Sequence, residues 1–512
     1  MRFGFGYLGQ FVFEYLGHTG SLFLTLTLAL NIFLVLIVFY LGIAGTLADA
    51  SGLPTSLWIV AVFVAGLYFL SRKSLNMTIA VTLIVVAINV TLLLIIPLLV
   101  LPHIQPVNFN TPLSNNQSFD PTALRLIFGV MLTNYFAHLL IANYGRVVLR
   151  RDPSARAWIW GIVAAMGATV LISCLWVIAI NGSVSPQVLT QQAGTVLTPL
   201  AALVGPIVNL LGSILVILSL GIATIHNSLG MYYLIQERLP VRTSGLFGER
   251  GRFVIGLIPL LGVFLLAEWF AITNSGSFAG LLSLSGVITL SLLGGIFPVL
   301  LFAATRRKGD LVPGVVYRWI GNPVLLIVAF LLFLAAIFAH GLFIWESLAE
   351  RIVTIVIGLL VLSATLVMLR RGILTPRAVV ELCDDQSGDG SSRFAITACG
   401  EPTRARVELN YTGGTREFDA VAGEIPTFAA LESARFHLPD TPARELKVWV
   451  HQLTAEGGSK GLPAQLTLRG NGADRTQTVA DGQALLSLSG GARQVEIGLV
   501  SCARVLETKD QS

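Results

Sequence analysis

Charge is scarce in this sequence. Only 12% of its 512 residues are Asp, Glu, Lys or Arg, which is about half the share found in ordinary soluble domains. Hydrophobic residues make up 54% of the chain and gather in long apolar runs that end near residue 370. This distribution argues against several soluble domains. It predicts a membrane domain over residues 1–371, followed by a small globular domain.

Groupings of chemically reactive residues are also missing. The four cysteines, Cys174, Cys383, Cys399 and Cys502, form no CxxC pair, so no zinc site is predicted. No carboxylates or histidines cluster in the apolar runs, and the rest of the chain shows no catalytic constellation. We therefore predict no enzyme, no catalytic residue, no metal site and no cofactor. The net charge of +5 comes from Lys and Arg at the ends of apolar runs, so nucleic acid is not an expected partner.

The apolar runs have the length of membrane-spanning helices. Such a helix needs about 20 mostly apolar residues. Ten segments qualify, at residues 20–46, 55–71, 77–102, 122–145, 155–182, 204–236, 253–275, 276–305, 322–345 and 348–370. The predicted fold is therefore mainly α, with about ten transmembrane helices.

The loops between these segments alternate in charge. One set is basic: Arg72 and Lys73, Arg146 to Arg156, Arg238 to Arg252, Arg306 to Lys308, and Arg370 to Arg377. Loops 47–54, 103–121 and 183–203 contain no Lys or Arg. The positive-inside rule then predicts a multi-pass protein of the cell membrane with both termini in the cytoplasm. In that reducing compartment a Cys383–Cys399 disulfide is not expected.

Polar residues inside the predicted spans mark candidates for function. His138 ends a stretch that also holds Gly129, Thr133, Asn134 and Tyr135. Thr133 and Asn134 either bond between helices or line a substrate cavity, and we interpret Tyr135 as a packing residue.

Two further spans contain an ionisable residue. His226 lies in a polar run with Thr224, and Glu268 lies next to Trp269. We interpret His226 as part of a helix–helix contact. We interpret Glu268 as a carboxyl group that lies near the membrane interface. The alternative for each is a role in carrying a proton.

Several motifs occur in an order typical of one transporter family. They are Pro199-Leu200-Ala201 with Gly205-Pro206, a long apolar run ending at 236–240, the basic loop 150–153, and 295–302 followed by 306–308. Residues 1–370 resemble the amino acid–polyamine–organocation superfamily, and within it the amino acid/auxin permease branch. The resemblance implies a LeuT-type fold, in which two inverted repeats of five helices surround a site at mid-membrane.

The resemblance leaves the start of the fold incomplete. It matches 20–46 to the third helix of the family, 122–145 to the sixth and 204–236 to the eighth, with residues 1–17 as the end of the second. The first helix, which has a glycine-rich break in the family, has no counterpart. We expect further helices before residue 1. A misassigned start, a degenerate relative and a second subunit are the alternatives.

The resemblance also implies a site. The implied substrate-binding residues are Asn31, Gly129, Thr133, Asn134, Tyr135 and His138, and the implied ion-coupling residues are Thr224, His226 and Glu268. The resulting hypothesis is a secondary transporter of amino acids or related small organic solutes, working by alternating access and coupled to H⁺ or Na⁺. The alternative is a membrane sensor or scaffold that does not transport and that signals through the C-terminal domain.

The last part of the chain has the pattern of short strands. Alternating apolar residues occur at 377–382, 404–409, 445–450, 464–468 and 494–499, separated by turn signals such as Gly413-Gly414 and Asp481-Gly482. This predicts an all-β, sandwich-like domain over residues 372–506, with 507–512 disordered. We expect this domain to bind a cytoplasmic protein partner or to regulate the membrane domain.

Overall fold

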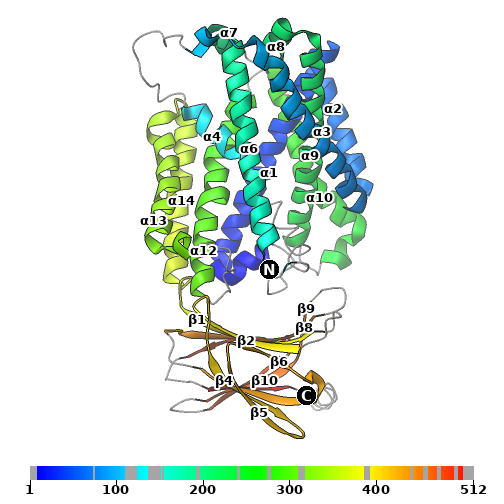
Figure 1. Cartoon of the computed structure of the whole chain (residues 1–512). Helices are drawn as coiled ribbons and strands as arrows, with labels where there is room; N and C mark the ends of the chain where they lie inside the picture. Colours follow the sequence, from blue (N-terminus) through cyan, green and yellow to red (C-terminus); the bar gives the residue numbers. More distant parts are fainter. Residues whose placement is uncertain are drawn as a thin grey trace.

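The computed structural model describes residues 8–72, 75–109, 124–135, 152, 155–191, 196–238, 243–273, 278–308, 318–385, 392–438, 442–453, 459–469, 474–488 and 494–499. These residues form a helical domain with a β domain at one end (Figure 1). The α-helices are α1 (Leu8–Ser51), α2 (Thr55–Arg72), α3 (Leu75–Val100), α4 (Leu124–Asn134), α6 (Arg156–Ser183), α7 (Pro186–Gln191), α8 (Leu197–Val204), α9 (Pro206–Arg238), α10 (Thr243–Thr273), α11 (Phe278–Ser285), α12 (Phe297–Arg307), α13 (Pro323–Ala339) and α14 (Leu348–Arg370). Short 3-10 helices are η1 (Leu101–His103), η2 (Pro106–Phe109) and η5 (Arg318–Gly321), and π-helices are η4 (Gly286–Ile296) and η6 (His340–Ile344).

Eight helical segments of the described chain are long and apolar enough to cross a membrane. Many of their Leu, Ile, Val and Phe side chains are exposed, which suits contact with acyl chains. The predicted fold class is confirmed: the chain is a polytopic helical membrane protein with a C-terminal β domain. The apolar part of α2 is shorter, at Thr55–Tyr68, and of the predicted span 122–145 the structure describes α4 and Tyr135.

Helix α1 is in contact with two sets of helices. Its residue Gly42 leaves so little space that a Cβ there would lie 2.7 Å from Leu220 of α9 and 2.8 Å from Phe278 of α11. Nearer the start of α1, the ring of Phe23 lies 5.8 Å from that of Phe297 of α12. Helix α9 and the continuous stretch α11–η4–α12 therefore run antiparallel to α1 on two of its sides.

The span at residues 276–305 contains Gly294, Gly295 and Pro298, residue types that often interrupt a helix. Paired glycines and Pro298 predict an interruption of the span, but the backbone stays helical and widens into the π-helix η4. Every residue of η4 except Gly294 is buried. Pro298 falls in the first turn of α12, directly after η4. The span is thus widened where a break was expected.

Glycine also allows α4 to cross α11–η4 at very short range. An added Cβ on Gly129 would lie 2.3 Å from the carbonyl oxygen of Ser283, and one on Gly286 would lie 2.1 Å from that of Gly129. Real Cβ atoms are not found so close to backbone, so both positions require glycine. Small residues of this kind let membrane helices pack backbone against backbone.

The C-terminal domain is a sandwich of two sheets, with orders β12-β8-β1-β2-β3 and β11-β10-β13-β7-β4-β5, β6 pairing with β2 and β9 with β8. The strands are β1 (Arg377–Asp385), β2 (Ser392–Ala398), β3 (Glu401–Pro402), β4 (Ala405–Tyr411), β5 (Gly414–Ala420), β6 (Ala422–Ile425), β7 (Leu431–His437), β8 (Glu445–Leu453), β9 (Ser459–Gly461), β10 (Ala464–Arg469), β11 (Arg475–Val479), β12 (Gln483–Ser487) and β13 (Gln494–Leu499). A short 3-10 helix, η7 (Phe428–Ala430), precedes β7. The predicted strands lie on β1, β4, β8, β10 and β13.

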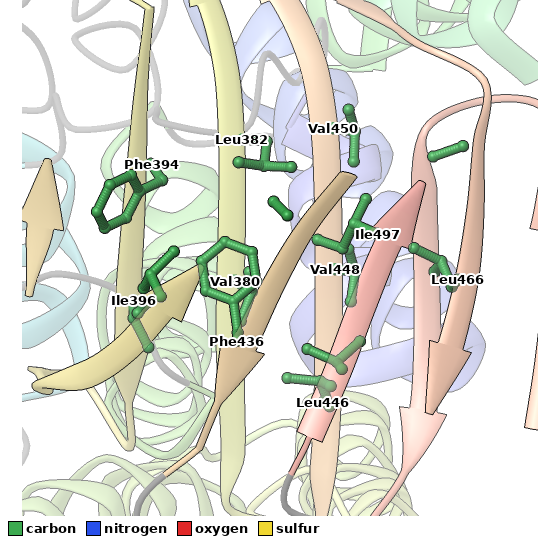
Figure 2. Close-up of a cluster of buried hydrophobic side chains, with 14 of the residues drawn as sticks. Val380, Leu382, Phe394, Ile396, Phe436, Leu446, Val448, Val450, Leu466 and Ile497 are labelled. Carbon is green, nitrogen blue, oxygen red and sulfur yellow. The ribbon is translucent and has the colours of Figure 1, made fainter. Parts of the chain in front are cut away.

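The two sheets enclose an apolar core. Val380, Phe394, Phe436, Val448 and Ile497 come from both sheets and are buried together (Figure 2). The other face of β1 and β8 is buried as well, although it is polar. Arg377, Glu381, Lys447 and His451 on that face are each at most 5% exposed. This sheet is the one nearer the helices (Figure 1), so its outer face is not a solvent-exposed surface. Cys383 on β1 and Cys399 are free thiols, in agreement with the expectation of no disulfide.

The glycine crossing gives a prediction for stability. Gly286→Ala places a methyl group against the Gly129 backbone, so we expect the free energy of unfolding to fall by about 1–3 kcal/mol, as for other overpacked cores. Gly161→Ala in α6 is the matched control, because a Cβ there meets nothing within 4 Å. Thermal denaturation of the purified full-length protein measures both. An unchanged melting temperature for Gly286→Ala would contradict the close crossing.

Candidate functional site

A hydrogen-bonded cluster of neutral polar groups lies buried between α1 and η4. Thr289 Oγ1 donates to Asn31 Oδ1 at 2.7 Å and lies equally close, at 2.7 Å, to the carbonyl oxygen of Ser285. Thr289 and Ser285 are 0% exposed, and Asn31 is 5% exposed. A hydroxyl has a single proton to donate, so two acceptors share one donor here. The cluster therefore has spare capacity to accept a hydrogen bond from a ligand.

Helix α4 contacts the stretch α11–η4 from a side other than that of α1. Ser283 Oγ donates to the carbonyl oxygen of Arg125, and Gly286 lies against Gly129. The stretch α11–η4 thus lies between Asn31 on α1 and Gly129 on α4, and it contacts both residues.

Ser291 is a site candidate that the sequence prediction missed. Its side chain is 0% exposed, and its Oγ has no hydrogen-bond partner among the described residues. One turn of π-helix beyond Gly286 brings Ser291 level with the last turn of α4, which carries Thr133. The signal in the sequence was the series of hydroxyl residues at 283, 285, 289 and 291 within an apolar run. A buried hydroxyl without a partner is costly, which makes Ser291 a candidate ligand contact.

The predicted residues of α4 have different surroundings. Gly129 is a packing residue of the crossing, and Thr133 Oγ1 donates to the Gly129 carbonyl at 2.9 Å. Asn134 is exposed at the end of α4 and donates from Nδ2 to Ser173 Oγ of α6 at 3.3 Å. Tyr135 follows the helix and is half-buried. His138 lies outside the described residues. The roles of these residues in substrate binding stay predictions.

The two candidates on α9 bond to their own helix. Thr224 is buried, and its Oγ1 donates to the Leu220 carbonyl at 2.7 Å. His226 Nδ1 lies 2.9 Å from the Ile222 carbonyl. Such bonds satisfy a side chain without a neighbouring helix. Thr224 lies about two turns of α9 before Gly230, where an added Cβ would lie 3.7 Å from Ile32 of α1. Thr224 is therefore near α1 but not part of the Asn31 cluster.

Glu268 of α10 is in a separate place. Its Oε1 is buried and has no hydrogen-bond partner among the described residues. Glu268 lies on α10, whereas the Asn31 cluster lies between α1 and η4.

His340 was also missed, although it lies within a predicted span. It begins the π-helix η6 and is 2% exposed. Its Nδ1 lies 2.8 Å from the Ala336 carbonyl and its Nε2 lies 3.4 Å from the Leu124 carbonyl at the start of α4. The Phe128 ring is 5.2 Å away. His340 therefore joins α13 to α4, close to the Arg125–Glu346 ion pair.

The chemistry available in the Asn31 cluster is neutral. It offers one amide, several hydroxyls and the backbone of a π-helix, a geometry often found at functional sites. Among the described residues, no group of three or more His, Cys, Asp or Glu side chains could hold a metal ion. The cluster therefore presents neutral hydrogen-bonding groups in a setting from which water is excluded.

Comparisons with known proteins give a limited result. No family model matches the chain, and no curated protein matches it. Among solved structures, the crystal structure of a mutant manganese transporter from Eremococcus coleocola is similar in part. It is 17% identical with a TM-score of 0.45, and the match covers 71% of this chain and 84% of that one. A likeness of this extent assigns neither a family nor a substrate to this chain.

Proposed function

We propose that the helical domain is a secondary transporter of amino acids or related small organic solutes. The observation that carries this proposal is the Asn31–Thr289–Ser285 cluster, a set of neutral polar groups buried among apolar helices. Polar groups inside a membrane domain are expensive and tend to mark the path of a substrate. The resemblance of residues 1–370 to amino acid permeases supports the same assignment.

The cluster favours a solute with N–H donors and no net charge. Asn31 Oδ1 and the Ser285 carbonyl compete for the proton of Thr289, so an amine could supply the second hydrogen bond. No ionised side chain is part of the cluster, and a net charge would be poorly compensated there. The zwitterion of an amino acid meets both conditions. Ser291, with its unpartnered hydroxyl, is a further contact in this proposal.

The proposed mechanism is alternating access. Helix α1 packs against α9 and α10 in one cluster and against η4, α12 and α14 in another. The half of α1 before Leu28 and the half after it therefore belong to two packed groups of helices, and in this proposal the solute passes between them. The LeuT-type arrangement is part of the proposal.

Glu268 is the proposed carrier of a coupling proton. Its buried Oε1 lacks a hydrogen-bond partner among the described residues, and a protonated carboxyl tolerates an apolar setting better than a carboxylate does. Thr224 and His226, in contrast, are already bonded to their own helix. We therefore propose H⁺ in preference to Na⁺ as the coupling ion.

The second candidate function is a sensor or scaffold that does not transport. The β domain favours it, because its inner sheet is fastened to α1 by Arg377 and Lys447, which both contact Glu14. In this alternative, a cytoplasmic protein binds the outer sheet, which is the sheet β11-β10-β13-β7-β4-β5. A change in the conformation of α1 would reach that protein through these contacts. In either case we propose the cell membrane as the location, with the N-terminus and the β domain in the cytoplasm. The basic loops support this orientation.

Counterflow tests the transport proposal without knowledge of the coupling ion. The full-length protein is placed in liposomes preloaded with one amino acid at a time, and uptake of the same labelled amino acid is measured. We expect saturable uptake for at least one amino acid. Asn31→Ala or Thr289→Val should lower it roughly tenfold or more, as expected for loss of a buried hydrogen bond to a substrate.

The matched control is Thr91→Val in α3, where the hydroxyl is exposed and bonds to the Ala87 carbonyl. Its uptake should equal that of the unaltered protein. Specific binding of an amino acid without any flux would support the sensor in place of the transporter.

The variant Glu268→Gln tests whether proton coupling can be lost while solute counterflow is kept. A glutamine keeps the size of the side chain but cannot take up a proton, so counterflow should persist while accumulation driven by a pH gradient is lost. Both rates are measured in the same liposomes. If gradient-driven accumulation survives in Glu268→Gln, Glu268 is not the proton carrier.

A further inference from the structure

Helix α1 has a break near its start. Gly17 has φ 72° and ψ −172°, which separates residues 8–16 from the long helix that follows. A left-handed φ of this kind favours glycine. A Cβ added to Gly17 would meet nothing within 4 Å, so no neighbouring side chain is packed against the break. Gly17 therefore has the character of a hinge.

The segment before the hinge is held by charged groups of the β domain. Glu14 Oε1 accepts from Arg377 Nη1 at 2.7 Å and lies 2.9 Å from Lys447 Nζ. Arg377 also pairs with Glu445 at 3.0 Å. The side chains of Arg377 and Lys447 are 5% and 6% exposed. Removing one partner of an ion pair this well shielded from water leaves a buried charge uncompensated.

A third cation reaches the same segment from α12. Lys308 Nζ donates to the backbone carbonyls of Tyr15 at 2.9 Å and Glu14 at 3.3 Å. Burial, followed by repulsion from Arg377, lowers the pKa of Lys308 to about 8. We call Glu14, Lys308, Arg377, Glu445 and Lys447 the Glu14 cluster. Three cations and two carboxylates thus meet at residues 14 and 15.

Residues 371–377 link the two domains, and they also contact α1 after the Gly17 hinge. Arg371, at the end of α14, donates from Nη1 to Thr19 Oγ1 at 3.1 Å. Ile373 is buried in one cluster with Tyr15 and Leu16. Residues 371–377 therefore contact α1 both before and after Gly17, so the β domain cannot move away from the helices without releasing the segment 8–16.

We propose that the β domain is a strap across the Gly17 hinge, and that the Glu14 cluster fixes the angle of segment 8–16 to the rest of α1. The position of the β domain regulates the protein. While the β domain is docked it holds segment 8–16, and a partner that displaces the β domain frees this segment. The relevance for transport rests on the proposed function, because α1 also carries Asn31. The strap itself can be measured without any substrate.

Hydrogen exchange of the full-length protein in lipid nanodiscs tests the strap. Lys447→Met removes one contact of Glu14 with a side chain of similar length, and Glu14→Gln removes the charge and keeps the shape. In both variants we expect amide exchange in segment 8–16 to rise roughly tenfold or more, as for loss of a charge-assisted hydrogen bond. Exchange in α9 should not change. The double variant should exchange no faster than the faster single one, because both remove the same contact.

Two controls make the result specific. Arg406→Met removes an ion pair with Glu417 on the outer sheet, where both side chains are 58% exposed, and it should leave segment 8–16 protected. Lys447→Arg keeps the charge and should also preserve protection. Unchanged exchange of segment 8–16 in both Lys447→Met and Glu14→Gln overturns the strap, as does an equal rise in Arg406→Met. If Lys447→Met does not fold, Glu14→Gln alone decides. Neither outcome depends on whether the protein transports amino acids.

Discussion

The helical domain depends on one constraint, which is that polar groups buried in a membrane must find partners inside the protein. Most of the described polar side chains meet it through their own helix, as Thr224 and His226 do. The Asn31–Thr289 bond is different because it joins two helices distant in sequence. Ser291 on η4 and Glu268 on α10 each keep a buried oxygen without a hydrogen-bond partner among the described residues. These are the places where the constraint is met least completely.

The architecture follows from this cluster and from glycine. Gly129 and Gly286 allow α4 to approach the backbone of α11–η4, and the π-helix then turns Thr289 toward α1 while Ser291 remains without a partner among the described residues. At the end of the bundle, the Glu14 cluster connects α1 to the sandwich. One helix thus joins the candidate solute site to the β domain.

The sequence was sufficient for the parts that depend on hydropathy and alternation. Apolar runs located the helices, and alternating strands located β1, β4, β8, β10 and β13, because each pattern reports which face is buried. The sequence was not sufficient where contacts between distant segments of the chain determine the local structure or the site. Paired glycines predicted a break but produced a π-helix, and Gly129 has a packing contact that only its partner Gly286 explains. The bond of Thr289 with Asn31 and the contact of Glu14 with Lys447 have no local signature, since the partners lie far apart in the chain.

The central claim is that the Asn31–Thr289 cluster binds a small amine-bearing solute. Thermal unfolding of the purified full-length protein in the presence of each amino acid in turn tests it most directly, because a ligand that binds only the folded state raises its stability with concentration. The account predicts a saturable rise in melting temperature for at least one amino acid. This rise should be lost in Thr289→Val and kept in Thr91→Val. An equal rise in Thr289→Val, or no rise with any amino acid, would contradict the claim.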